Sequence, residues 1–171
     1  MTPDGPEDFD EFVAVYWPRL VRIAHMLTGD FHEAEDLVQV TLVKVYAQWR
    51  RLSHVDIHVY VRQALINNNR SRLRKKRVAQ LLSPFTPEAI HRSHPGDAEA
   101  LEHRAVLVQA MSALPARQRA VLVLRYWDDM SEQDVAAILN CSVGSVKTHA
   151  HRGLRALRAH PELASYTSAR S

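Results

Sequence analysis

Apolar residues recur at helical spacing along almost the whole chain. Between residues 9 and 27 they lie three and four positions apart, which predicts a helix, and Gly29 suits its left-handed C-cap. Pro18 lies inside this stretch and either kinks one helix or starts a second. Asp30 and Glu33 match the pattern of an N-cap and its reciprocal partner, so a second helix of about 20 residues should begin there.

The rest of the chain is also patterned as helices, with one interruption. The alternation of apolar and polar residues that marks a strand is almost absent. Pro84, Pro87, Pro95 and Gly96 give the stretch between them the composition of a linker. Further helices are expected over residues 58–78, 98–113, 115–127, 132–139 and 143–158.

These patterns predict an all-α fold with two small helical domains joined by a flexible linker. We expect the first domain to span residues 1–79 and the linker to span residues 80–97. The second domain should span residues 98–160, and residues 161–171 should form a short C-terminal tail.

The end of the second domain has the pattern of a helix-turn-helix. Ser131 and Asp134 begin a short helix, a three-residue turn follows, and Ser142 caps a longer helix. The outward face of this last helix holds cations and hydroxyls but no acid, which suits the major groove of DNA. A helical hairpin with a solvated basic face has the same pattern, so the motif alone leaves both interpretations open. The outward residues are Ser145, Lys147, Thr148, His151, Arg152, Arg155 and Arg158.

The distribution of charge favours a polyanionic partner. The formal net charge is only +3, but residues 57–87 hold seven lysines and arginines without an acid. Residues 142–160 hold four more, again without an acid, whereas acids gather near the N-terminus and around residues 30–36. Two acid-free basic segments favour contact with nucleic acid over a merely solvated surface.

Other classes of protein are disfavoured by the composition. Cys141 is the single cysteine, which excludes a disulfide within the chain and a cysteine-based zinc site. His54 and His58, and likewise His91 and His94, have ligand spacing, but two ligands do not close a tetrahedral site, so no metal and no cofactor are expected. The sequence shows neither a signal peptide nor an apolar run of membrane length, so we expect a cytoplasmic protein without membrane insertion.

Three segments together resemble one protein family. Residues 114–158 read LPARQRAVLVLRYWDDMSEQDVAAILNCSVGSVKTHAHRGLRALR and strongly resemble region 4 of the extracytoplasmic-function (ECF) sigma factors of bacterial RNA polymerase, in the sigma-70 superfamily. Residues 32–49, HEAEDLVQVTLVKVYAQW, resemble region 2.2, and residues 60–77 resemble regions 2.3 and 2.4. The resemblance covers roughly residues 9–158, with the Pro-rich linker in the expected place.

The resemblance implies how the chain meets RNA polymerase core. One family motif docks the clamp helices of the β′ subunit, and residues 98–127 match the surface that meets the β flap. Asp36 and Gln39 stand three residues apart, so they share one helix face. The matched docking residues are Glu35, Asp36, Leu37, Val38 and Gln39.

The resemblance also implies two DNA-reading surfaces. Asn67 matches the family asparagine of the helix that reads the −10 element, and residues 51–58 match the loop that captures an unstacked base. Tyr60 stands where many members carry tryptophan. The −10 candidates are Tyr60, Arg62, Asn67, Asn68, Arg70 and Arg74, and the −35 candidates are Ser145, Lys147, Thr148, His151 and Arg152.

The sequence therefore indicates a sigma factor without enzymatic activity, which directs RNA polymerase core to specific promoters and aids promoter melting. Expected partners are the core enzyme, promoter DNA and an anti-sigma factor. One rival is a repressor or activator that binds a palindrome as a dimer, which would not need the docking motif. Another is a nucleic-acid-processing enzyme, which would need clustered acids or an activated nucleophile, and the sequence contains no such arrangement.

Overall fold

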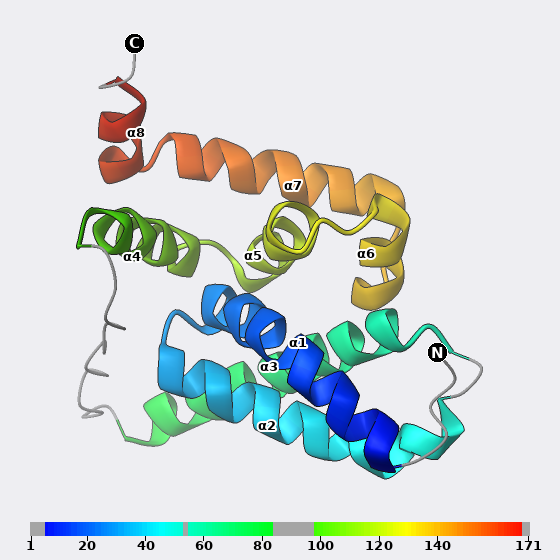
Figure 1. Ribbon diagram of the computed structural model, residues 1–171. Coiled ribbons are helices and arrows are strands. Elements are labelled where there is room, and N and C mark those ends of the chain that lie inside the picture. Colours follow the sequence, from blue (N-terminus) through cyan, green and yellow to red (C-terminus); the bar gives the residue numbers. More distant parts are fainter. Residues whose placement is uncertain (1–5, 53–54, 84–97, 169–171) are drawn as a thin grey trace.

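The computed structural model describes residues 6–52, 55–83 and 98–168, and the regular structure in these ranges is entirely helical. The expected all-α fold is confirmed. Figure 1 shows two groups of helices, one above the other. The first group contains α1 (Pro6–Thr28), α2 (Phe31–Gln48), a 3₁₀ turn (Trp49–Arg51) and α3 (Ile57–Leu82). The second group contains α4 (Ala98–Ser112), α5 (Ala116–Leu122), a π-helical turn η2 (Val123–Trp127), α6 (Glu132–Leu139), α7 (Val143–Arg158) and α8 (Pro161–Ser168).

Helix α1 decides between the two alternatives for Pro18. The helix continues through this proline as one element, so Pro18 lies inside it. Gly29 follows the last helical residue with a φ of 78°, the left-handed conformation that glycine adopts without strain. The C-cap expected at Gly29 is therefore confirmed.

Only half of the capping pattern expected at the start of α2 forms. The Asp30 carboxylate accepts a hydrogen bond from the backbone N–H of Glu33 at 2.9 Å, as an N-cap should. The Glu33 carboxylate does not reach back, because it pairs with Arg72 and Lys76 on α3. The predicted reciprocal bond is wrong, since two cations on a neighbouring helix compete for the same carboxylate.

Aromatic residues fill the core of the first group of helices. Trp49 is buried at the end of α2, where the ring of Phe9 meets it edge-on at a centroid distance of 5.0 Å. Phe12 lies beside it at 5.4 Å and stacks on Tyr16. These contacts join α1 to the end of α2, which also packs against α3.

The helix-turn-helix of the second group forms as expected. The Ser131 hydroxyl accepts from the N–H of Asp134 at 3.0 Å, and the Ser142 hydroxyl accepts from the N–H of Ser145 at 3.1 Å. Asn140 ends α6 in the left-handed conformation, with a φ of 49°. This tight turn sets α7 across α6, and α7 crosses over α5 and packs against it (Figure 1).

Two glycines of α7 should respond in opposite ways to a methyl group. A Cβ on Gly153 would lie 2.8 Å from Leu122 Cδ1 and 3.1 Å from its Cγ, in the packed interface with α5. We expect Gly153→Ala to lower the free energy of unfolding by about 1–2 kcal/mol through overpacking. Gly144 is exposed, and a Cβ there would lie 3.8 Å from its nearest neighbour, Ser142 Oγ. Gly144→Ala should therefore raise the free energy of unfolding by about 0.5 kcal/mol. Urea denaturation of both variants checks this; a stabilised Gly153→Ala would contradict the packing described.

Some element ends differ from those predicted. Helix α3 continues to Leu82, past the boundary placed at residue 79, and residues 84–97 of the expected linker lie outside the described ranges. The tail contains α8, where the sequence predicted only a short tail. Tyr166 on α8 meets the ring of His103 on α4 at 4.4 Å, so a tertiary contact holds this short helix.

Candidate nucleic-acid interface

Helix α7 presents most of the predicted −35 residues on one side. Thr148, His151 and Arg152 are exposed and Ser145 is half-buried, and the spacing of three and four residues puts them on one face. We call these four residues the recognition face. The Thr148 hydroxyl donates to the carbonyl of Gly144 at 3.0 Å, which leaves its oxygen free to accept. The recognition face therefore offers both donors and acceptors.

Lys147 lies to one side of that face. Its Nζ is 3.7 Å from a carboxylate oxygen of Glu132 at the start of α6. The lysine side chain is 64% exposed, so this ion pair is weak and leaves the ammonium available to a phosphate. Lys147 stands four residues before His151, so it lies at the edge of the recognition face.

Helix α3 presents four of the six predicted −10 residues together. Tyr60, Asn67 and Arg74 are seven residues apart, about two turns, so they share a face, and Arg70 lies next to Asn67 and Arg74. Asn67, Arg70 and Arg74 are exposed and Tyr60 is half-buried. We call these four residues the promoter face.

The other two predicted −10 residues point elsewhere. The Asn68 amide donates to Thr41 Oγ1 at 3.0 Å and accepts from Lys44, which ties α3 to α2. Arg62 is buried and donates to the carboxylate of Asp128 in the second group of helices. Helical rotation explains both placements, because neither position falls on the side of α3 that carries Asn67.

The predicted polymerase-docking motif is divided between core and surface. Leu37 and Val38 are buried in the first core, whereas Asp36 and Gln39 are exposed and Glu35 is half-buried. Three further residues of α2, outside the motif matched in the sequence, are exposed despite being large and apolar. They are Val40, Val43 and Tyr46.

These exposed apolar residues lie on the same side of α2 as Asp36 and Gln39, because each of the five is three or four positions from at least one other member of the set. We call Asp36, Gln39, Val40, Val43 and Tyr46 the docking face. Val43 is 70% exposed, and apolar side chains gathered on one face of a monomer are typical of a protein interface. Their spacing of three positions along α2 is the sequence signal that could have indicated Val40, Val43 and Tyr46.

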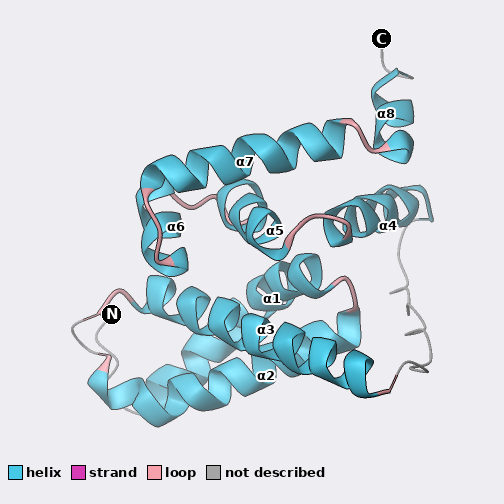
Figure 2. Ribbon diagram, turned by 180° about the vertical axis from the view of Figure 1, so that it is seen from behind, coloured by secondary structure: helices cyan, strands magenta, loops and turns pink. Residues whose placement is uncertain are grey.

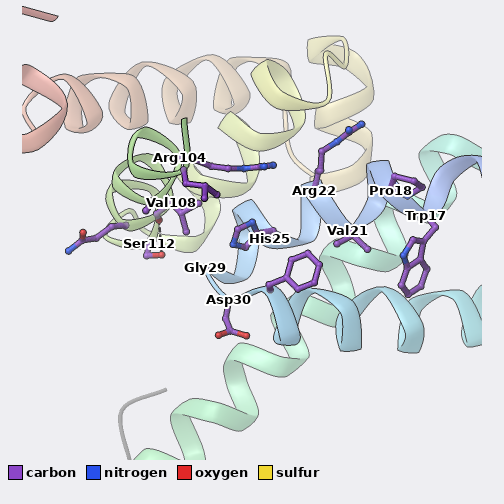
Figure 3. A pocket seen from close by; sticks show the side chains of 14 residues that line it. Trp17, Pro18, Val21, Arg22, His25, Gly29, Asp30, Arg104, Val108 and Ser112 are labelled. Carbon is purple, nitrogen blue, oxygen red and sulfur yellow. Dashed lines mark hydrogen bonds between the residues drawn. The ribbon is translucent and has the colours of Figure 1, made fainter. Parts of the chain in front are cut away.

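A pocket of about 680 Å³ lies between α1 and α4, where the two groups of helices meet (Figure 3). Val21, Phe31 and Val108 supply apolar walls, and the figure shows Arg22 and Arg104 at its rim. Burial, and next the charge of Arg104, lower the pKa of His25 in this pocket, so the imidazole is neutral near pH 7. The positive charge of the pocket therefore comes from its arginines.

The described residues contain no cluster of three or more histidine, cysteine, aspartate or glutamate side chains that could hold a metal ion. His58 lies in the first turn of α3, close to the hydroxyl of Tyr16. His54, His91 and His94 lie outside the described ranges. Within the same ranges, no helix combines the length and the apolarity needed to cross a bilayer.

Comparisons with known proteins decide the family. Residues 12–78 match the family described as Sigma-70 region 2, and residues 104–157 match the family described as Sigma-70, region 4. The chain is 33% identical over 152 residues to the RNA polymerase sigma-E factor of Streptomyces avermitilis, covering 88% of this chain and 83% of that protein. This chain belongs to the ECF sigma factors of the sigma-70 family. An ECF sigma factor directs RNA polymerase to promoters when transcription begins.

Further relatives agree with that assignment. The sigma factor SigW of Bacillus subtilis is 29% identical, covering 90% of this chain and 89% of that protein. The sigma factor RpoE of Bartonella quintana, solved in complex with the anti-sigma factor NepR, superposes with a TM-score of 0.76 at 27% identity over 93% of this chain and 98% of that chain. CnrH, solved with the cytosolic domain of CnrY, shares the fold with a TM-score of 0.68 at 19% identity.

Proposed function

We propose that three faces of this sigma factor divide the work of initiation. The docking face of α2 binds the β′ clamp helices of core polymerase, the promoter face of α3 reads the −10 element, and the recognition face of α7 reads the −35 element. The observation that carries the DNA-reading part is the acid-free, exposed face on the second helix of a helix-turn-helix. Cations and hydroxyls there match the donors and acceptors that base edges and phosphates require.

The docking face supports the polymerase contact. Val40 and Val43 are at least half exposed, Tyr46 is 52% exposed although its ring meets that of Phe9, and a polar pair, Asp36 and Gln39, lies beside them. An interface with an apolar centre and a polar rim is the usual arrangement between proteins. In the second group of helices the exposed rings of Tyr126 and Trp127 are available for the contact with the β flap.

The promoter face also supports a role in melting. Aromatic Tyr60, the amide of Asn67 and the cations Arg70 and Arg74 form one side of α3. An unpaired strand is held by stacking on aromatic rings and by cations along its backbone. Holding that strand would favour the melted promoter. The chain would act in the cytoplasm, where it meets polymerase and chromosome.

We further propose that an anti-sigma factor holds this chain through the pocket between α1 and α4. Its apolar walls and arginine rim fit an amphipathic helix with acidic residues. Arg22→Glu should raise transcription from the dependent promoters in cells severalfold, since the antagonist loses a partner, while transcription with purified core enzyme stays unchanged. Reporter assays measure the first quantity and run-off assays the second. An unchanged reporter signal would remove the pocket from the proposal.

The experiment that tests the proposed function is transcription with purified core RNA polymerase from a library of randomised promoters. We expect the chain to select templates with two conserved blocks, and core enzyme alone to select none. Transcripts that do not depend on the added chain would contradict the proposal.

A further inference from the structure

A chain of hydrogen bonds lies inside the contact between α2 and α3, which Figure 2 shows packed against each other. Thr41 has no exposed surface and Asn68 is 9% exposed. The Asn68 amide nitrogen donates to Thr41 Oγ1 at 3.0 Å, and the Thr41 hydroxyl donates in turn to the carbonyl of Leu37 at 2.7 Å. Asn68 Oδ1 accepts from Lys44 Nζ at 2.5 Å, so every polar atom of the two buried side chains is bonded. We call Thr41, Lys44 and Asn68 the polar network.

The polar network is the part of this contact that depends most strictly on position. The other buried residues of α2 are apolar, and apolar contact is non-directional, so it permits small shifts of one helix against another. Glu33 also pairs with Arg72 and Lys76 on α3, but these long side chains are partly exposed and can follow such a shift. The bond from Asn68 to Thr41 cannot, because a buried amide without a partner is costly. The polar network therefore selects one register of α3 on α2, as a buried asparagine does in coiled coils.

The register of α3 decides where the promoter face points. Successive residues of a helix point about 100° apart, so Asn68 directed toward α2 leaves Asn67 directed to solvent. Arg70 and Arg74 are exposed on the same side as Asn67. Lys44, which closes the network on α2, directly follows Val43 of the docking face. The polar network thus fixes the proposed −10 reader against the helix proposed to hold polymerase.

We propose that Asn68 is a positioning residue for recognition of the −10 element, an inference that rests on the proposed function. The sequence grouped Asn68 with residues that contact −10 DNA, but both ends of its amide are bonded inside the protein. Asn68 acts instead through Asn67, because it holds α3 in the register in which the Asn67 amide meets its base. A group that reads a base must be held within about 0.5 Å of its productive position, and the polar network supplies that restraint.

The double variant Asn68→Leu/Thr41→Val provides the first test. It removes both buried partners and replaces them with apolar groups of similar shape, so it should unfold near the wild-type temperature and bind core enzyme with wild-type affinity. In transcription by reconstituted holoenzyme from randomised −10 elements, we expect discrimination at the position read by Asn67 to fall about tenfold, while preference in the −35 element stays unchanged. A folded double variant with wild-type discrimination at −10 would overturn the proposal.

Asn69→Leu is the matched control. Asn69 is the next residue of α3 and is 7% exposed, but its Oδ1 accepts from Arg72 of the same helix, at 3.2 and 3.1 Å. The change removes hydrogen bonds within α3 and leaves those of the polar network in place, so −10 discrimination should equal that of the wild type. An equal loss in this control would assign the effect to general packing and refute a specific role of Asn68.

A double-mutant cycle with Asn67→Ala separates positioning from direct contact. If Asn68 acts through Asn67, adding Asn68→Leu/Thr41→Val to Asn67→Ala should lower −10 discrimination no further. Losses that add would show that Asn68 contacts DNA by itself, which contradicts a positioning role.

Lys44→Met tests the same proposal without a change in the core. Lys44 is exposed, so this variant should keep wild-type stability even if the double variant does not fold. We expect a smaller loss of discrimination, about threefold, at the same −10 position, because Asn68 keeps one of its two partners. Discrimination equal to that of the wild type would count against the network. A wild-type holoenzyme that selects no −10 block at all would instead refute the proposed function.

Discussion

Val43→Asp should lower the affinity of the chain for core RNA polymerase about a hundredfold. Val43 is the most exposed of the apolar residues on the docking face, so the substitution disturbs no core contact. On binding, the new carboxylate would be buried without a partner in an apolar interface, at a cost of about 3 kcal/mol. Fluorescence anisotropy of labelled protein titrated with core enzyme measures the change.

Val15→Asp is the control for that variant. Val15 is 64% exposed on α1, so the same change of residue type is made at a similar exposure but away from the docking face. We expect it to bind core enzyme as the wild type does, and both variants to unfold at the wild-type temperature. Equal loss of affinity in the two variants would place the polymerase contact outside α2.

Arg152→Ala and Lys147→Ala should change transcription in different ways. Arg152 belongs to the recognition face and can form a two-pronged contact with a base, so its loss should shift preference at one −35 position by about 1–3 kcal/mol. Lys147 lies beside that face near Glu132, so we expect it to contact phosphate. Its loss should weaken binding to all promoters alike. It should also reduce the slope of log affinity against log salt concentration by about one unit.

Transcription by reconstituted holoenzyme from a library of randomised −35 elements, at several salt concentrations, separates these outcomes. Arg155→Ala, further along α7, shows whether any lost cation has the same effect. If neither Arg152→Ala nor Lys147→Ala alters promoter choice or salt sensitivity, α7 is not the −35 reader, and the helix-turn-helix describes the fold alone.

Local signals in the sequence predicted the helices well. Ser131, Ser142 and Gly29 act within a few residues of their own position, so caps and turns could be located without knowledge of the rest of the fold. The capping partner expected of Glu33 was wrong because Arg72 and Lys76 are far away in sequence. Helix α8 depends in the same way on a contact with α4.

The candidate site was predicted less completely, because a motif match assigns residues in blocks whereas a helix distributes them around its axis. Leu37 and Val38 belong to the matched docking motif but lie in the core, and Val40 and Val43 lie outside the motif but on its exposed face. The contact between Arg62 and Asp128 joins residues from two domains, and no local pattern indicates it.

The central claim is that this chain binds core RNA polymerase and brings it to promoters. Gel filtration of the purified chain with bacterial core RNA polymerase tests it most directly. We expect the chain to elute with the core enzyme as a one-to-one complex, and Val43→Asp to elute separately. Elution of the wild-type chain apart from core enzyme, together with tight binding of the isolated protein to a palindrome as a dimer, would contradict the account and support a free-standing repressor.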